Sequence, residues 1–382
     1  MRILIALTYY RPHVSGLTIY AERLARGLAR RGHAVSVLTS RFAPGLAPRE
    51  TVDGVEIVRV PIATKLSKGV IMPRFAAYAA DCIGRCDVLN IHMPQFEAAL
   101  LAGLGRLARR GVVLTYQCDL RLPHGALNRI VEASLRPLNR LAAAAAHALV
   151  TTSDDYARHS PYLSRYARKL HAIAPPVDLP EPSAAETERL VGRWQLDRGV
   201  RIGFAARFAA EKGVEYLLRA LPAVLEALPD ARVVFTGAYK DTVGEEEYWQ
   251  QLAPLLERYR DRLVFLDLLP AAAMPSFYAL CDVVAVTSLN STEAFGMVQV
   301  EAMLCGTPVV ATDLPGVREP VHRTGMGRIV AARDPAALGA ALIEVVRHRS
   351  HYVRPRAEVA AAFDLERSLT EYEGLFESVV RG

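Results

Sequence analysis

The stretch SLNSTEAFGMVQVEAMLCGTPVVATDLPGVRE, residues 288–319, decides the fold of the second half of this chain. It follows the apolar run of residues 283–286, which predicts a buried strand. Residues from about 295 to 304 carry apolar side chains at helical spacing, and Gly306 is expected to end that helix. The apolar residues 309–312 predict another buried strand. A strand, loop, helix and strand in this order are typical of a parallel α/β sheet.

Two carboxylates and the start of the expected helix form a first candidate site. Glu293 stands just before the helix and Glu301 inside it. At about 1.5 Å per helical residue they lie roughly 12 Å apart along the axis, which approaches the length of a sugar nucleotide. Ser291 and Thr292 are candidate N-caps. Free backbone N–H groups at a helix N-terminus bind phosphate and sugar oxygens well, and here they would come from Phe295, Gly296, Met297 and Val298.

A pair of cations marks a second turn. Residues 201–206 predict a strand, and the sequence RFAAEKG follows it directly at residues 207–213. In open α/β sheets, ligands bind at such strand-to-helix turns. Arg207 can grip a diphosphate as a planar fork and Lys212 as a point charge.

These patterns together resemble family 4 of the retaining glycosyltransferases. The motifs that carry the resemblance are R-x4-K-G at 207–213, E-x-F-G-x4-E-A at 293–302, G-x-P-V-V-A-T at 306–312 and P-G-x-x-E at 315–319. The resemblance extends over almost the whole chain and is strongest in its second half. It implies the α/β fold called GT-B, in which two Rossmann-like domains face each other across a cleft. Taken singly, each glutamate would only complement a helix dipole or be solvated, so the full pattern carries the functional interpretation.

The resemblance also implies a role for each residue of the second-half motifs. Glu293 would contact the transferred sugar, and Glu301 would hold the ribose hydroxyls. Arg207 and Lys212 would bind the diphosphate and, with Glu293, would be catalytic. Leu266 lies where the family binds the nucleotide base through backbone groups; a glycine is common nearby, so the base cannot be read from this chain.

The first half contributes Gly16 and Gln117. The opening strand, loop and helix look like the start of the family, where a glycine-rich loop lies near the donor, so Gly16 is a donor-binding candidate. Many family members carry a histidine where Gln117 stands, close to the reacting sugar. Glutamine can bond a sugar hydroxyl but cannot exchange a proton near pH 7, so an acid–base role is not carried over to this tentative catalytic residue. His92 and His124 are each either neighbours of Gln117 or structural.

Proline spacing sets the expected domain boundaries. Four prolines lie within residues 174–182, so residues 175–190 are expected to be a linker. Residues 1–174 would form an N-terminal acceptor-side domain and residues 191–362 a C-terminal donor-side domain. Residues 363–382 would be a helix that crosses back onto the N-terminal domain, as it does in relatives.

Composition limits the class of protein. The chain has 382 residues, of which 51% are hydrophobic, so it can build two cores and is not disordered. No apolar run reaches the length of a transmembrane helix, and the short first strand does not read as a signal peptide. Five cysteines without metal or redox spacing fit a reducing cytoplasm.

Positive charge is concentrated in the first half. Residues 1–175 contain 24 Lys and Arg against 11 Asp and Glu, whereas the remainder contains 22 against 29. This asymmetry favours contact with an anionic partner, such as a membrane surface or a lipid-linked phosphate, or else it is only a solvated surface. No zinc-finger or RNA-binding signature indicates nucleic acid.

The sequence therefore predicts a retaining hexosyltransferase that uses a UDP- or GDP-sugar and an acceptor hydroxyl in glycolipid, polysaccharide or other glycoconjugate synthesis. It is expected to be cytoplasmic, with peripheral contact at the inner face of the membrane. We expect no cofactor and no metal, because two cations already face the diphosphate. Two alternatives stay open: a sugar-nucleotide epimerase of the same fold, and a catalytically inactive nucleotide-sugar-binding protein.

Overall fold

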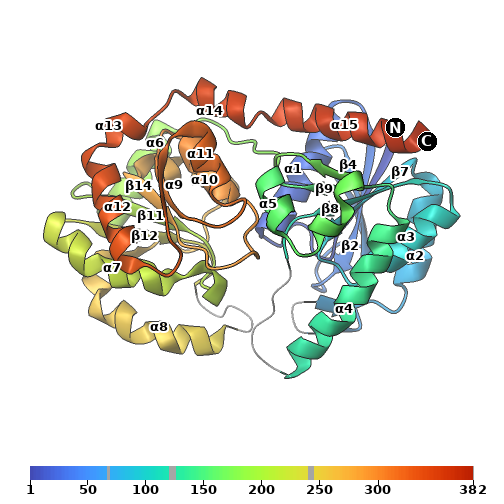
Figure 1. Ribbon diagram of the computed structural model, residues 1–382, viewed down its shortest axis with the longest axis horizontal. Coiled ribbons are helices and arrows are strands. Elements are labelled where there is room, and N and C mark those ends of the chain that lie inside the picture. Colours follow the sequence, from blue (N-terminus) through green and yellow to red (C-terminus); the bar gives the residue numbers. More distant parts are fainter. Residues whose placement is uncertain (67–68, 120–125, 240–244, 382) are drawn as a thin grey trace. The chain divides into compact units, whose positions relative to one another are not determined.

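A computed structural model describes residues 1–66, 69–119, 126–239 and 245–381 of the protein. The chain forms two compact units. Unit 1 consists of residues 1–176 and 364–382, and unit 2 of residues 177–363 (Figure 1).

Unit 1 is built on an eight-stranded sheet in the order β10-β9-β8-β7-β1-β2-β4-β3. All neighbouring strands are parallel except β3 and β4, which are antiparallel. The strands are β1 (Arg2–Ala6), β2 (Ala34–Arg41), β3 (Arg49–Val52), β4 (Val55–Pro61), β7 (Val88–Met93), β8 (Gly111–Tyr116), β9 (Ala148–Thr151) and β10 (Leu170–Ala172), with a separate hairpin of β5 (Thr64–Leu66) and β6 (Gly69–Ile71). The helices are α1 (Gly16–Arg30), α2 (Phe75–Arg85), α3 (Ala98–Leu107), α4 (Ala126–Ala145), α5 (Asp154–His159) and α15 (Leu365–Arg381).

Unit 2 is built on a six-stranded, wholly parallel sheet in the order β13-β12-β11-β14-β15-β16. The strands are β11 (Arg201–Ala205), β12 (Arg232–Thr236), β13 (Leu263–Phe265), β14 (Val283–Val286), β15 (Val309–Thr312) and β16 (Gly327–Val330). The helices are α6 (Ala184–Trp194), α7 (Val214–Ala227), α8 (Glu246–Arg258), α9 (Met274–Leu280), α10 (Met297–Leu304), α11 (Glu319–Thr324), α12 (Pro335–Arg347), α13 (Arg349–Tyr352) and α14 (Arg356–Ala362).

Alternating residues of β14 show why its sequence is apolar throughout. Val283 and Ala285 pack into the core on one face of the unit 2 sheet, and Val284 and Val286 into the core on the other face. Successive side chains of a strand point to opposite faces, so a strand covered on both sides must be apolar at every position. The prediction of buried strands at residues 283–286 and 309–312 is confirmed.

Strand order fixes where each sheet can bind a ligand. In unit 2 the first strand, β11, lies beside the fourth, β14, and the chain runs outward in opposite directions from this pair. In unit 1 the strand β1 lies in the same way between β2 and β7. Helices that follow the two central strands diverge, which leaves a crevice at the carboxyl ends of the strands. The turns after β11 and β14, and after β1 and β7, are therefore the positions for a site.

The expected linker of residues 175–190 is too long. Val177 and Leu179 are buried in the core of unit 2, and Ser183 caps α6 by accepting a hydrogen bond from the Glu186 backbone N–H at 3.3 Å. Prolines stop regular structure in this stretch but do not prevent its apolar side chains from packing. Unit 2 thus begins at Val177 rather than at residue 191.

The C-terminal helix α15 belongs to unit 1 and is fixed by a buried hydroxyl cluster. The Tyr372 hydroxyl lies 2.8 Å from that of Tyr20 on α1 and 3.1 Å from Thr115 Oγ1 on β8. Gly27 lets the two helices approach closely, because a Cβ there would lie 2.7 Å from the Leu369 side chain. None of the described helices combines the length and apolar content that crossing a membrane requires.

We expect Tyr372→Phe to lower the free energy of unfolding of unit 1 by about 1–3 kcal/mol, because it leaves buried hydroxyls short of a partner. Urea unfolding followed by circular dichroism measures this change. Tyr78→Phe on α2 is the control, since the Tyr78 hydroxyl has no hydrogen-bond partner among the described residues, and its effect should stay within about 0.5 kcal/mol. Equal stability of the two variants would show that the hydroxyl cluster does not hold α15.

Candidate functional site

The turns that follow β11 and β14 are joined by two hydrogen bonds to backbone carbonyl oxygens. The Thr287 hydroxyl donates to the Lys212 carbonyl oxygen at 2.7 Å, and the Leu289 N–H donates to the Glu211 carbonyl oxygen at 2.9 Å. Gly213 has a φ of 63°, and a Cβ there would lie 2.4 Å from the Thr287 carbonyl oxygen. Only glycine allows both this backbone conformation and this approach. The two turns therefore form one rigid platform at the crevice of the unit 2 sheet.

Both predicted cations of this platform are paired with carboxylates. Lys212 Nζ lies 2.5 Å from Glu293 Oε2, and these side chains are 23% and 20% exposed. The Arg207 guanidinium forms an ion pair with Glu211, four residues further along the chain. The structure thus brings Arg207, Lys212 and Glu293 to the carboxyl ends of two adjacent strands.

The segment before α10 folds differently from the prediction. Asn290 Oδ1 accepts hydrogen bonds from the backbone N–H of Thr292 at 3.0 Å and from its hydroxyl at 2.7 Å. This asparagine turn replaces the expected capping by Ser291 or Thr292, and the helix begins later, with Gly296 as its cap at φ 76°. The prediction of Ser291 or Thr292 as the N-cap is wrong.

The expected set of free N–H groups is also incomplete. Glu293 Oε1 accepts the hydrogen bond of the Gly296 N–H at 3.0 Å, so that donor is occupied. Met297 and Val298 lie in the first turn of α10, where backbone N–H groups precede the first intrahelical bond. The Phe295 side chain is buried and packs against Phe363, so only its backbone could face a ligand.

Glu301 lies in the middle of α10 and is only 6% exposed. Its Oε2 accepts a hydrogen bond from the buried Tyr278 hydroxyl of α9 at 2.7 Å. Only the part from Met297 onward is helical, so the premise that one helix axis joins Glu293 to Glu301 is wrong.

Leu266 is part of the sheet edge rather than an open loop. Its N–H donates to the Phe235 carbonyl oxygen at 2.9 Å, and its side chain is buried. The backbone changes course at the next residue, Asp267, which has a φ of 57°. Any ligand contact of Leu266 must therefore use its carbonyl oxygen.

In unit 1 the structure brings Gln117 close to His92 and to the start of α1. Gly16 is the first residue of that helix, and the Ser15 hydroxyl caps it by accepting from the Thr18 N–H at 3.3 Å. Gln117 Nε2 lies 2.6 Å from His92 Nδ1 and 3.5 Å from the Leu17 carbonyl oxygen. His92 is fully buried, and burial lowers the pKa of its imidazole to about 3. His124 lies outside the described residues.

Comparison with known proteins agrees with this arrangement. Residues 199–348 match the family model described as glycosyl transferases group 1, and residues 15–176 match the glycosyl transferase 4-like domain. The chain is 30% identical to the 2-deoxystreptamine N-acetyl-D-glucosaminyltransferase of Streptomyces fradiae, over 94% of this chain and 90% of that one. It belongs to the group 1 glycosyltransferases, family 4.

Two further relatives extend the comparison of this glycosyltransferase over nearly its whole length. The phosphatidyl-myo-inositol mannosyltransferase of Mycobacterium leprae is 27% identical over 99% of this chain and 97% of its own. The crystal structure of Anabaena HepE in complex with UDP-glucose has a TM-score of 0.78 at 22% identity, and covers 99% of this chain and 100% of that one. The predicted GT-B fold is confirmed, and the protein is a glycosyltransferase.

Sequence reasoning missed two contacts made by carboxylates in this glycosyltransferase, the ion pair of Glu211 with Arg207 and the hydrogen bond that Glu301 accepts from Tyr278. Glu211 follows Arg207 by four residues, a spacing that favours an ion pair on a helical turn and could have suggested it. Tyr278 gave no such signal, because it is 23 residues from Glu301 in an apolar segment and reads as core.

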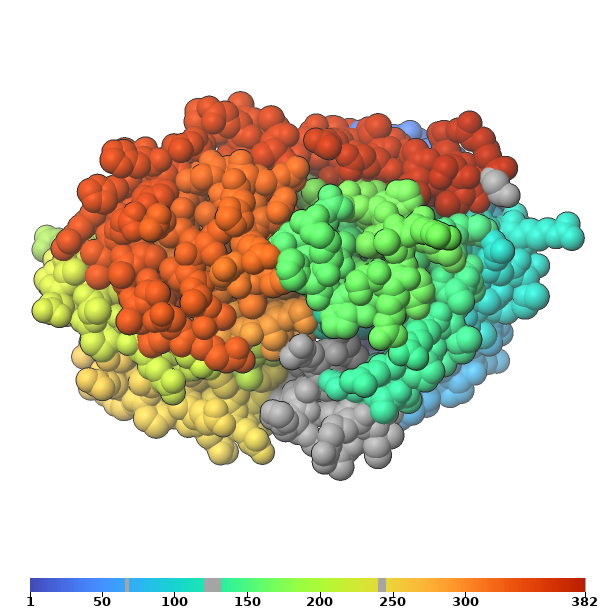
Figure 2. Space-filling view, in the orientation of Figure 1, coloured from blue at the N-terminus to red at the C-terminus, as the bar shows by residue number. Residues whose placement is uncertain are grey.

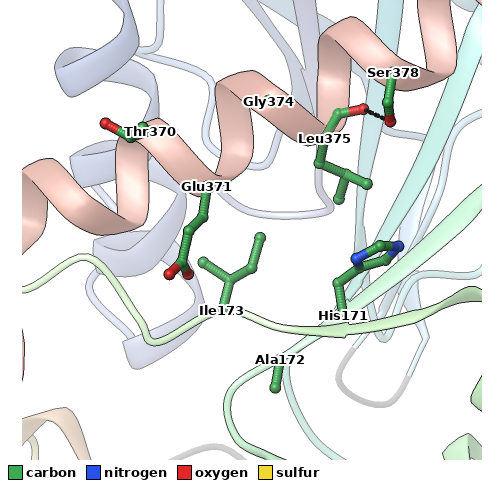
Figure 3. Close-up of a pocket in the computed structure, with 8 residues that line it drawn as sticks. All are labelled: His171, Ala172, Ile173, Thr370, Glu371, Gly374, Leu375 and Ser378. Carbon is green, nitrogen blue, oxygen red and sulfur yellow. Dashed lines mark hydrogen bonds between the residues drawn. The ribbon is translucent and has the colours of Figure 1, made fainter.

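A groove of about 550 Å³ lies elsewhere in unit 1, between the end of the edge strand β10 and helix α15 (Figure 3). Ile173 and Leu375 form its apolar floor, and Glu371, its one carboxylate, pairs with Arg367. None of the predicted site residues lines it. The turns at the carboxyl ends of the strands, and not this groove, are the candidate active site.

Proposed function

We propose that this glycosyltransferase transfers a hexose, with retention of anomeric configuration, from a UDP- or GDP-sugar to an acceptor hydroxyl. The observation that carries the proposal is the pairing of Lys212 with Glu293 beside the N-terminus of α10, at the crevice of the unit 2 sheet. A cation, a carboxylate and helix N–H groups at one crevice suit a diphosphate joined to a sugar.

Donor binding on this platform is an exchange of anions. Glu293 neutralises Lys212, and Glu211 neutralises Arg207. The diphosphate of the donor takes over both cations, with the arginine as a fork and the lysine as a point charge. Glu293, released from Lys212, then turns to the sugar hydroxyls. The two carboxylates thus neutralise the cations until the diphosphate replaces them.

The same cations serve the chemical step. As the bond from the sugar to phosphate breaks, negative charge develops on the leaving diphosphate. Arg207, Lys212 and the N–H groups of Met297 and Val298 stabilise that charge, so the reaction proceeds without a metal or other cofactor. Attack from the same face of the sugar gives retention, and the leaving phosphate takes the proton of the acceptor hydroxyl.

The remaining proposed donor contacts come from residues outside the platform. Glu301, oriented by Tyr278, accepts hydrogen bonds from the ribose hydroxyls, and the backbone at Leu266 faces the base. For unit 1 the family resemblance supports Gly16, at the first turn of α1, and Gln117 as donor contacts, Gln117 through a sugar hydroxyl. The complexes of HepE with UDP and with UDP-glucose support a nucleotide-sugar donor.

For the acceptor we propose a saccharide or lipid-linked hydroxyl reached at an anionic membrane surface. Unit 1 has 26 Lys and Arg against 16 Asp and Glu. Its helix α4 lies on the surface (Figure 2). Arg136 and Arg140 of this helix are exposed, as is Leu141 next to Arg140 in the sequence, with an exposed fraction of 61%. Exposed arginines beside an apolar side chain suit peripheral contact with anionic lipid. The M. leprae relative, whose name refers to a phosphatidylinositol acceptor, supports this acceptor class.

We expect Arg207→Ala and Lys212→Ala each to lower turnover by about 10²–10³-fold, because each removes a charge that stabilises the leaving diphosphate. Release of nucleoside diphosphate, measured with a panel of UDP- and GDP-sugars and acceptors, tests this. Arg198→Ala removes an equal charge from a side chain that is 91% exposed and should leave the rate unchanged. If both site variants turn over normally, the donor does not bind at this platform.

Glu293→Gln and Glu301→Gln should separate the two ends of the donor. Glu301→Gln should weaken binding of free UDP or GDP by about 1.5–3 kcal/mol, since a charged hydrogen bond to ribose is lost. Glu293→Gln should lower kcat, yet bind the free diphosphate as tightly as wild type or more so, because Lys212 no longer has an internal partner. Calorimetry and kinetics give both quantities, and Glu257→Gln, 74% exposed, is the control. The opposite assignment of the two effects would reverse the donor on α10.

Activity should persist in the presence of EDTA, because protein cations alone neutralise the leaving group. The measurement is the rate of diphosphate release before and after chelation and dialysis. A full loss of activity that Mg²⁺ or Mn²⁺ restores would overturn the metal-independent mechanism.

A further inference from the structure

We propose that His92 is a positioning residue that fixes the carboxamide of Gln117 in one orientation, with the NH₂ toward the protein and the oxygen toward the substrate. The enzyme thereby selects a sugar hydroxyl that donates a hydrogen bond at this point. The inference rests on the proposed function, since it assigns the hydrogen-bonding sense of a sugar-binding residue.

The two neighbours of Gln117 determine which end of its amide faces inward. Its Nε2 lies 3.5 Å from the Leu17 carbonyl oxygen and 2.6 Å from His92 Nδ1. A carbonyl oxygen can only accept a hydrogen bond, so the group that faces Leu17 must be the NH₂. The second N–H of that group then points at the ring of His92, whose Nδ1 must be unprotonated to accept it.

The burial of His92 keeps its imidazole in this accepting form. The side chain is fully buried on β7, and burial lowers its pKa to about 3, which favours the neutral ring near pH 7. A neutral imidazole carries one proton, and with Nδ1 accepting from Gln117 this assigns the proton to Nε2, which is buried without a hydrogen-bond partner among the described residues. The Tyr20 ring packs against His92 at 5.7 Å and 76°, and its hydroxyl is in turn held by Tyr372. The acceptor therefore has a fixed position.

As a consequence, the carboxamide of Gln117 can only accept a hydrogen bond from a ligand. Both N–H bonds of Gln117 are directed at protein atoms, while its Oε1 has no hydrogen-bond partner among the described residues. An oxygen that can only accept binds a hydroxyl through the hydroxyl proton. A hydroxyl meets this requirement, but fluorine, of similar size, has no proton to donate. A carboxamide that was free to flip would instead present its NH₂ to the fluorine, and the enzyme would then tolerate replacement of the hydroxyl by fluorine.

The test measures donor discrimination rather than activity alone. The probes are UDP-glucose and GDP-mannose, together with the deoxy and deoxyfluoro analogue at each hydroxyl of the hexose. For wild type we expect one position at which both analogues lower kcat/KM by about tenfold or more, the fluoro analogue as severely as the deoxy one.

Three variants assign that discrimination to the His92–Gln117 pair. His92→Phe keeps a ring but removes the acceptor, so the fluoro analogue should recover to within about threefold of the parent donor, whereas the deoxy analogue should not. His92→Asn restores an acceptor near the former Nδ1 and should restore the discrimination. Thr115→Val, which removes buried hydrogen bonds to Asn90 and Tyr372 but none to Gln117, should leave the ratio as in wild type.

Each result either supports or overturns the proposal. If His92→Phe lowers kcat/KM for all donors by one factor and the ratio is unchanged, His92 is merely structural. If wild type shows no sensitive hydroxyl, Gln117 does not read one, although the transferase function stands. If no probe is turned over and none binds, the proposed function itself fails, and this inference with it.

A measurement on the wild-type protein avoids any dependence on variant folding. The ¹⁵N chemical shifts of His92 report which ring nitrogen carries the proton. We expect an unprotonated Nδ1 and a protonated Nε2 at every pH from 5 to 8. A proton on Nδ1 would reverse the amide of Gln117 and overturn the proposal.

Discussion

The close approach of two backbone turns, at Gly213 and Thr287, is the constraint on which the candidate active site depends. A parallel sheet brings the carboxyl ends of β11 and β14 to one edge, but it does not fix the loops that leave them. Here the Thr287 hydroxyl bonds the Lys212 carbonyl, and a side chain at residue 213 would collide with the Thr287 carbonyl. Lys212 and Glu293 are 81 residues apart in the chain and meet because of this contact.

The pairing of these charges explains how two partly buried cations can stand on one platform. Partly buried cations without partners would lose hydration without compensation. Glu293 and Glu211 provide that compensation. In the mechanism we propose, binding of the donor would replace one anion by another rather than create new ion pairs, which would favour release of the product diphosphate. The net affinity then depends on the better fit of a diphosphate to both cations at once.

The sequence pattern was sufficient to predict the strands of the sheet, but it predicted the geometry of the candidate site less well. The runs at 283–286 and 309–312 predicted their strands to the residue, because burial on both faces demands an unbroken apolar run. The start of α10 was misplaced, because the amide of Asn290 forms a turn with Thr292 that capping rules alone do not reveal. The partnership of Tyr278 with Glu301 was missed, since it joins two helices and leaves no periodic trace.

Polar groups in the core of unit 1 follow a different logic from the ion pairs of unit 2. Asn90, Thr115, Tyr372 and Tyr20 form a chain of neutral hydrogen bonds, and Tyr20 packs on His92. Such a network contributes little net stability, but each member fixes the orientation of the next, because reversing one leaves two donors or two acceptors facing each other. The network ends at the Tyr20 ring, which limits where the imidazole lies but, as a packing contact, does not decide which of its nitrogens carries the proton. In the mechanism we propose, such neutral contacts hold the imidazole in place beside Gln117, whereas the exchangeable charges of unit 2 serve binding and release.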